Sequence, residues 1–106
     1  MNNQLAEKLR PERFTAMSGK MAAIVAYILG TRWTEPAISE LVVTSDGFVL
    51  AQREDDIGAN EIIGEERDLN RNLLDLVHAA GLTDDEIAEF GRLQRERIGR
   101  WSNPRG

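Results

Sequence analysis

The sequence predicts an α+β domain in which a helix, a β-hairpin and two further helices follow one another. Three observations predict this order. Apolar residues recur at steps of three and four in residues 11–29 and 65–80, which is typical of helices with one apolar face. Two runs of β-favouring residues flank Asp46-Gly47, and a helix-capping sequence begins at Thr83.

Length and composition indicate one small domain. The chain has 106 residues, 42% hydrophobic and 29% charged, and a chain of this size buries a modest core without metals or crosslinks. We expect residues 1–106 to form a single domain whose ends, 1–10 and 102–106, fray. The longest apolar run, residues 21–29, is too short to span a bilayer, and the N-terminus lacks a signal-peptide pattern. We therefore expect a cytoplasmic protein with no membrane partner.

The first third of the chain predicts helix. Residues 3–9 can form a short helix in front of the domain, and Pro11 then interrupts it or begins the next helix. From Pro11 to Leu29 a single apolar face follows the helical period, and Gly30 is expected to end this helix. The face consists of Phe14, Met17, Met21, Ile24, Val25 and Ile28.

Residues 40–53 predict the hairpin, because Asp46-Gly47 favours the positive backbone angles of a tight turn. Each flanking run has three consecutive apolar residues, so apolar side chains emerge on both faces. Two strands alone are marginally stable in water, so we expect helices to cover one face and a second copy of the chain to cover the opposite face or a free edge. The expected interface residues are Leu41, Val42, Val43, Phe48, Val49 and Leu50.

The second half of the chain predicts a loop and then a helix. Residues 54–64 are acidic and contain glycines, which indicates a loop that passes into a helix. An amphipathic helix follows over residues 65–80, and Gly81 closes it, with Leu82 packing back on its last turn. Its apolar face consists of Leu69, Leu73, Leu76, Val77 and Ala80.

The last element is a helix that starts at Asp84. Thr83 and Glu86 form a capping box, in which each side chain accepts a hydrogen bond from the backbone N–H of the other. Ile87, Phe90, Ile98 and Trp101 share one face of this helix, so we expect Trp101 to pack in the core.

Charge is distributed unevenly along the chain, whose formal net charge is −5. Residues 1–39 have a net charge of +2, residues 40–89 of −11 and residues 90–106 of +4. We expect an acidic central surface that meets a basic protein partner, and it comprises Asp55, Asp56, Glu61, Glu65 and Asp68. The basic end indicates either contact with a polyanion or folding back onto the acidic centre.

No motif predicts a catalytic site, a metal site or a cofactor. The chain has no cysteine, which excludes thiolate nucleophiles, disulfides and cysteine-ligated metals, and its one histidine, His78, excludes multi-histidine sites. No phosphate-binding glycine motif is present. A carboxylate- or metal-dependent enzyme at residues 54–61 remains the third of three functional hypotheses.

The second hypothesis is a nucleic-acid-associated regulator. Arg92, Arg95, Arg97 and Arg100 could contact a polyanion. Residues 81–88 (GLTDDEIA) resemble the entry to the first helix of many bacterial helix-turn-helix domains. Such motifs usually place a small residue four positions after the alanine, where this chain has Arg92, and the net negative charge also opposes this function.

The leading hypothesis is a non-enzymatic homodimeric module for protein interaction or regulation, without a cofactor. It rests on the two apolar faces of the predicted hairpin, which require cover. Residues 38–51 (ISELVVTSDGFVLA) resemble the first hairpin of roadblock/longin-like sensor modules, and that resemblance implies dimerisation and regulation of nucleotide switches. Those folds continue with further strands, whereas residues 65–99 here predict two helices.

Overall fold

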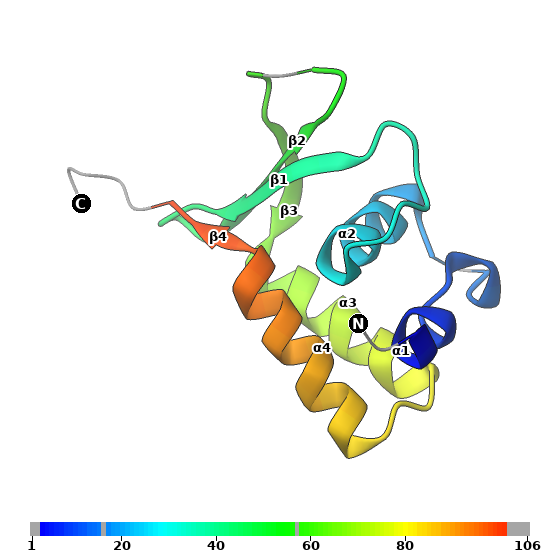
Figure 1. Ribbon diagram of the computed structural model, residues 1–106. Coiled ribbons are helices and arrows are strands. Elements are labelled where there is room, and N and C mark those ends of the chain that lie inside the picture. The colour runs from blue at the N-terminus through cyan, green and yellow to red at the C-terminus, as the bar shows by residue number, and fades with distance from the viewer. Residues whose placement is uncertain (1–2, 16, 57, 102–106) are drawn as a thin grey trace.

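The computed structural model describes residues 3–15, 17–56 and 58–101 (Figure 1). Within these residues the chain forms four helices and a four-stranded mixed sheet, which confirms the α+β class. The elements in order are α1 (Asn3–Lys8), a 3-10 turn (Pro11–Arg13), α2 (Gly19–Leu29), β1 (Ile38–Val43), β2 (Phe48–Arg53), β3 (Glu61–Glu65), α3 (Glu66–Ala79), α4 (Asp84–Arg97) and β4 (Gly99–Arg100).

The sheet has the strand order β3-β2-β1-β4. β2 pairs with β1 and with β3 in antiparallel fashion, and β4 pairs with β1 in parallel. A turn that includes Gly47, whose φ is 88°, joins β1 to β2. The helices lie on one side of the sheet (Figure 1). We call the side that faces them the inner face and the opposite side the outer face.

Strand register separates the apolar residues of the two central strands into these two faces. Leu41 pairs with Ala51 and Val43 pairs with Val49, and all four side chains are buried on the inner face. Residues between them point to the opposite side, because side chains alternate along a strand. Val42 and its partner Leu50 therefore lie on the outer face, and both are only half-buried.

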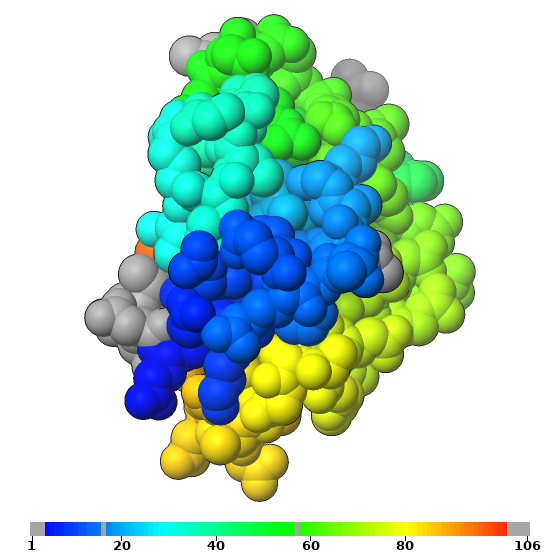
Figure 2. Space-filling view, turned by 90° about the vertical axis from the view of Figure 1, so that its right-hand side faces the viewer, coloured from blue at the N-terminus to red at the C-terminus, as the bar shows by residue number. Residues whose placement is uncertain are grey.

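One core lies between the inner face and the helices. It joins buried residues of every helix with those of β1 and β2, and Leu5, Leu9, Ile24, Ile28, Leu41 and Val49 have essentially no exposed surface. The N-terminal segment adds to this layer, and Figure 2 shows it in blue between the cyan and green strand end of the molecule and the yellow α3–α4 connection. Residues 102–106, where fraying is predicted, lie outside the described residues.

The predicted helix ends are confirmed. Gly30 ends α2 in the left-handed region with φ 71°, and Gly81 has φ 67° after α3. At α4 both bonds of the capping box form: Glu86 N–H donates to Thr83 Oγ1 at 3.2 Å, and Thr83 N–H donates to Glu86 Oε1 at 2.9 Å.

The predicted helix over residues 11–29 is too long. Pro11–Arg13 form only a 3-10 turn, and α2 begins at Gly19, where Ser18 accepts a hydrogen bond from the backbone N–H of Met21 at 3.1 Å. Such a cap favours a helix start at this point. Phe14 and Met17 still pack against the core, from the segment before the helix.

Two strands replace predicted loop and helix. Residues 61–65 form β3 against β2, and a register shift between the pairs Val49–Gly64 and Leu50–Ile62 leaves Ile63 without a partner residue in the ladder. The last helix ends at Arg97, after which β4 pairs with β1. Trp101 continues this strand, donating its N–H to Val43 O at 2.9 Å, and it is 53% exposed. The prediction that Trp101 packs in the core is therefore wrong.

Candidate interaction surface

Apolar side chains form a row across the outer face of the sheet. Ile62 of β3 pairs with Leu50 of β2, and Leu50 pairs with Val42 of β1. Opposite Val42 on β4 stands Gly99, where an added Cβ would lie 3.3 Å from Val42 Cγ1. Because position 99 is glycine, no side chain of β4 lies beside Val42 on the outer face of the sheet.

Two aromatic residues, Phe48 and Trp101, lie beside this row, on the side nearer the β1–β2 turn. Phe48 is two residues from Leu50 on β2, and Trp101 is two residues from Gly99, so alternation places both on the outer face. Phe48 is 41% exposed and Ile62 is 63% exposed. We call Val42, Phe48, Leu50, Ile62 and Trp101 the outer patch. Three of its members are among the four large hydrophobic side chains that are exposed in the described residues; the fourth is Leu74 on α3.

The outer patch is contiguous from β3 to the end of β4, a distance of three strand spacings of about 4.8 Å, and along β2 it covers the two residues from Phe48 to Leu50, about 7 Å. Exposed apolar side chains that adjoin one another, rather than standing singly, mark a candidate contact surface. Polar residues flank the row along the strands, as at the rim of protein interfaces: Glu40 and Gln52 on one side, and Glu65, which pairs with Phe48, on the other.

Of the six predicted interface residues, three lie on the outer face of the sheet and three on the inner face. Val42, Phe48 and Leu50 belong to the outer patch. Leu41, Val43 and Val49 are buried on the inner face beneath the helices of the same chain, so they have no surface to offer to a partner. Sequence reasoning missed Ile62 and Trp101, although Ile62-Ile63 is a β-branched pair of the kind that favours a strand.

The predicted acidic residues are not gathered into one site. Glu61 lies between Lys20 and Arg53, with N–O distances of 3.5 and 3.7 Å, Glu65 pairs with Arg67, and Asp68 pairs with Arg71 at 2.7 Å. Asp55 and Asp56 are exposed in the turn after β2. Within the described residues no group of three histidine, cysteine or carboxylate side chains is placed to hold a metal ion.

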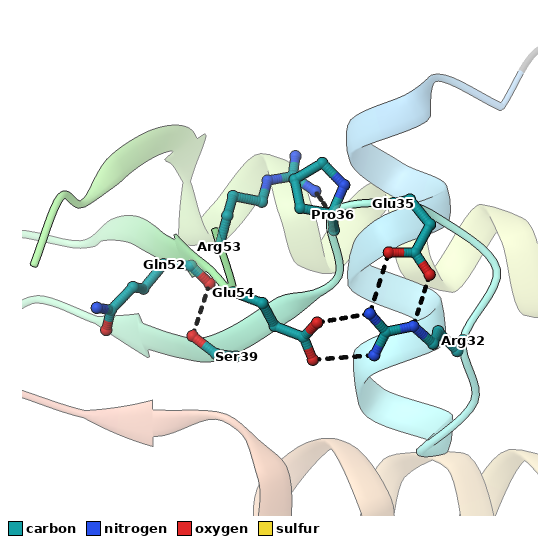
Figure 3. A network of polar contacts seen from close by, with 7 residues as sticks. All are labelled: Arg32, Glu35, Pro36, Ser39, Gln52, Arg53 and Glu54. Carbon is teal, nitrogen blue, oxygen red and sulfur yellow. Dashed lines mark hydrogen bonds and ion pairs between the residues drawn. The ribbon is translucent and has the colours of Figure 1, made fainter. Parts of the chain in front are cut away.

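Glu54, the first residue of the acidic stretch 54–64, helps to link two segments of the chain. The guanidinium of Arg32 lies between the carboxylates of Glu35 and Glu54, with hydrogen bonds of 2.6 to 3.0 Å to both (Figure 3). Glu54 also donates its N–H to Ala37 O at 3.0 Å. Donation from Arg32 lowers the pKa of Glu35, and the two carboxylates raise the pKa of Arg32. These contacts fasten the segment before β1 to the end of β2.

Two of the four predicted polyanion contacts are already paired with carboxylates of the chain. Arg92 pairs with Glu89 and Glu96 on its own helix, and Arg100 pairs with Glu66 of α3. Arg97 lies against Gly30, where an added Cβ would meet its Nη2 at 2.8 Å. Arg95 lies beside the α3–α4 seam. The arrangement therefore gives no continuous basic surface from these four residues.

Comparison with known proteins does not assign the chain to a group. No family model, no curated protein and no solved structure matches it. The two partial resemblances of the sequence therefore gain no support from these comparisons. Among the described residues, none of the helices combines the length and the apolar character needed to cross a membrane.

Proposed function

We propose that the protein is a non-enzymatic interaction module that forms a homodimer through the outer face of its sheet. The observation that carries this proposal is the outer patch: apolar side chains on three adjacent strands, together with Trp101 directly after β4, lie on the face that no helix of the described chain covers. Leaving them in water forfeits a stabilisation that the chain obtains on its inner face.

The exposed side chains of the outer patch would stabilise a dimer by leaving water. Full burial of a large aliphatic or aromatic side chain contributes about 1.5–3 kcal/mol relative to exposure. Ile62 and Phe48 still have 63% and 41% of their surface in water. In a two-fold dimer each copy contributes the same residues, so every favourable burial occurs twice.

A second copy fits this face because its centre carries no charge. Each chain has a net charge of −5, so two copies repel one another at a distance. Val42, Leu50 and Ile62 form the row, and the nearest carboxylates flank it along the strands: Glu40 is two residues from Val42, and Glu65 pairs with Phe48. A symmetric contact centred on the row therefore brings apolar surface together while the carboxylates stay at the rim.

Thiol labelling tests this proposal, because the chain has no cysteine of its own. A single cysteine replaces Leu50 in one variant and Leu74 in another. Leu74 is an exposed apolar residue on α3, away from the sheet. We expect labelling at position 50 to slow as the protein concentration rises, and labelling at position 74 to stay constant.

Adding Ile62→Lys to the Leu50→Cys variant sharpens the test. A lysine in the apolar row opposes dimerisation, so labelling should become fast at every concentration. The proposal fails if labelling at position 50 does not depend on concentration in the absence of the lysine.

A further inference from the structure

We propose that the seam between α3 and α4 binds a small apolar carboxylic acid, with the guanidinium of Arg95 as the partner of the ligand's carboxylate. This site lies on the helical side of the molecule, away from the outer patch. It is therefore independent of the proposed dimer.

The seam contains two adjoining hollows. One has a volume of about 260 Å³ and is largely apolar; it is lined by Leu73, Leu74, Val77, Ile87, Phe90 and Gly91. The other has a volume of about 400 Å³ and is more polar, with Glu66, Arg95 and Arg100 among its lining residues. Asn70 and Gln94 line both hollows and are hydrogen-bonded to one another at 3.0 Å. The two hollows therefore adjoin along the seam, with this amide pair between them; together we call them the groove, which has an apolar end and a polar end.

Arg95 differs from almost all other cations of the chain. Of the twelve lysines and arginines that the structure describes, ten have a carboxylate oxygen within 4.0 Å; Arg95 and Arg97 are the two that do not. In a chain with five more acidic than basic residues, an arginine without a carboxylate has charge available for a ligand.

The position of Arg95 connects the two ends of the groove. Its Nη1 lies 3.4 Å from where a Cβ on Gly91 would stand, so the guanidinium folds back over a residue that lines the apolar hollow. Because Gly91 has no side chain, the Arg95 guanidinium can approach the helix backbone at this point. A carboxylate held by Arg95 would therefore have its apolar body beside Leu74 and Ile87.

The other arginine of the polar hollow is already neutralised. Arg100 Nη2 lies 2.5 Å from Glu66 Oε2, and this ion pair joins β4 to the first turn of α3. Glu66 also disfavours a second anion close to it. The ligand's charge is therefore assigned to Arg95, and the Asn70–Gln94 amide pair offers its remaining polar atoms beside it.

Calorimetric titration with octanoate tests this site, with 1-octanol as the neutral match and acetate as the match without an apolar body. We expect octanoate to bind more tightly than either. Replacing octanoate by decanoate should tighten binding, by up to about fourfold per methylene that becomes buried.

Arg95→Gln should weaken octanoate binding by about tenfold or more, because a hydrogen bond to a charged group is lost. Arg97→Gln is the matched control, because it removes the other unpaired arginine and should change the affinity less than twofold. Circular dichroism of each variant checks that it is folded. Equal affinity for octanoate and 1-octanol, equal weakening by both substitutions, or no octanoate binding would each overturn the proposal.

Discussion

The two faces of one sheet have opposite environments, although the same two strands supply apolar residues to both. On the inner face, Leu41 and Val49 have no exposed surface. On the outer face, Leu50 is half-buried and Ile62 is 63% exposed. The difference does not lie in residue type, because aliphatic side chains occupy both faces; it lies in the helices, which cover only one side (Figure 1).

This difference shows that one chain of this size covers only one face of its sheet with its own helices. Four helices and the inner face already form a core with little exposed apolar surface. No described helix remains to cover the second face. An antiparallel sheet with one solvated face commonly has polar residues there, and the apolar row of Val42, Leu50 and Ile62 departs from that pattern. The proposed contact with a second copy would account for this departure.

The largest expected effect contrasts Leu41→Ala with Leu50→Ala. Leu41→Ala leaves a cavity in the core, so it should lower the free energy of unfolding by about 2–5 kcal/mol. Leu50→Ala removes atoms from a half-buried side chain, so at low protein concentration it should lower this free energy less and should chiefly weaken self-association. Urea unfolding at low protein concentration measures the free energy of unfolding of both variants. Equal losses would show that the two faces are equivalent in the monomer.

A smaller effect is expected from the N-terminal cap of α4, one of the helices that cover the inner face. Thr83→Ala removes the oxygen that accepts the N–H of Glu86 at the start of α4. Loss of such a cap costs about 1 kcal/mol, so the urea midpoint should fall with an unchanged slope. Thr83→Ser retains the hydroxyl and should recover most of this loss. A loss with serine as large as with alanine would contradict the capping role.

The smallest expected effect is a dependence on pH at the same helix start. Lys8 Nζ of α1 lies 2.7 Å from Glu86 Oε1, and Glu86 is 7% exposed. Donation from Lys8, followed by that from the Thr83 N–H, lowers the pKa of Glu86 below its usual value. A lowered carboxyl pKa contributes stability that is fully present above the unfolded-state value and is lost as the pH falls through the folded-state value.

Glu86→Gln keeps an oxygen for the cap but removes the charge. Its free energy of unfolding should therefore fall less steeply than that of the parent as the pH is lowered through the acidic range. Lys8→Met should flatten the same profile, and Lys8→Met added to Glu86→Gln should change the profile no further. A profile with unchanged slope in Glu86→Gln would show that this ion pair does not affect stability.

Local signals in the sequence predicted those parts of the fold that local interactions determine. The capping box of Thr83 and Glu86 and the glycine ends at Gly30 and Gly81 depend on residues close in the chain, and all are present. The strand β3 was not predicted, because its two isoleucines stand among glutamates and a glycine and its partner is β2. Helical periodicity continues through Ile98 and Trp101, yet pairing of Gly99 and Arg100 with β1 ends the helix at Arg97.

The candidate surface was only partly predictable, because it also depends on contacts between residues far apart in the chain. The runs of three consecutive apolar residues, 41–43 and 48–50, indicated that the hairpin has two apolar faces, but only the packed helices determine which face is covered. Ile62 and Trp101 join the outer patch because β3 pairs with β2 and β4 pairs with β1. The β-branched pair Ile62-Ile63 was the one local signal of these pairings.

Light scattering on the unmodified protein measures dimer formation directly. We expect a mass near twice 11.9 kDa at high micromolar concentration, falling toward 11.9 kDa on dilution. A mass of 11.9 kDa at every concentration would show that the outer face of the sheet remains in water, and the proposed dimer would then be wrong.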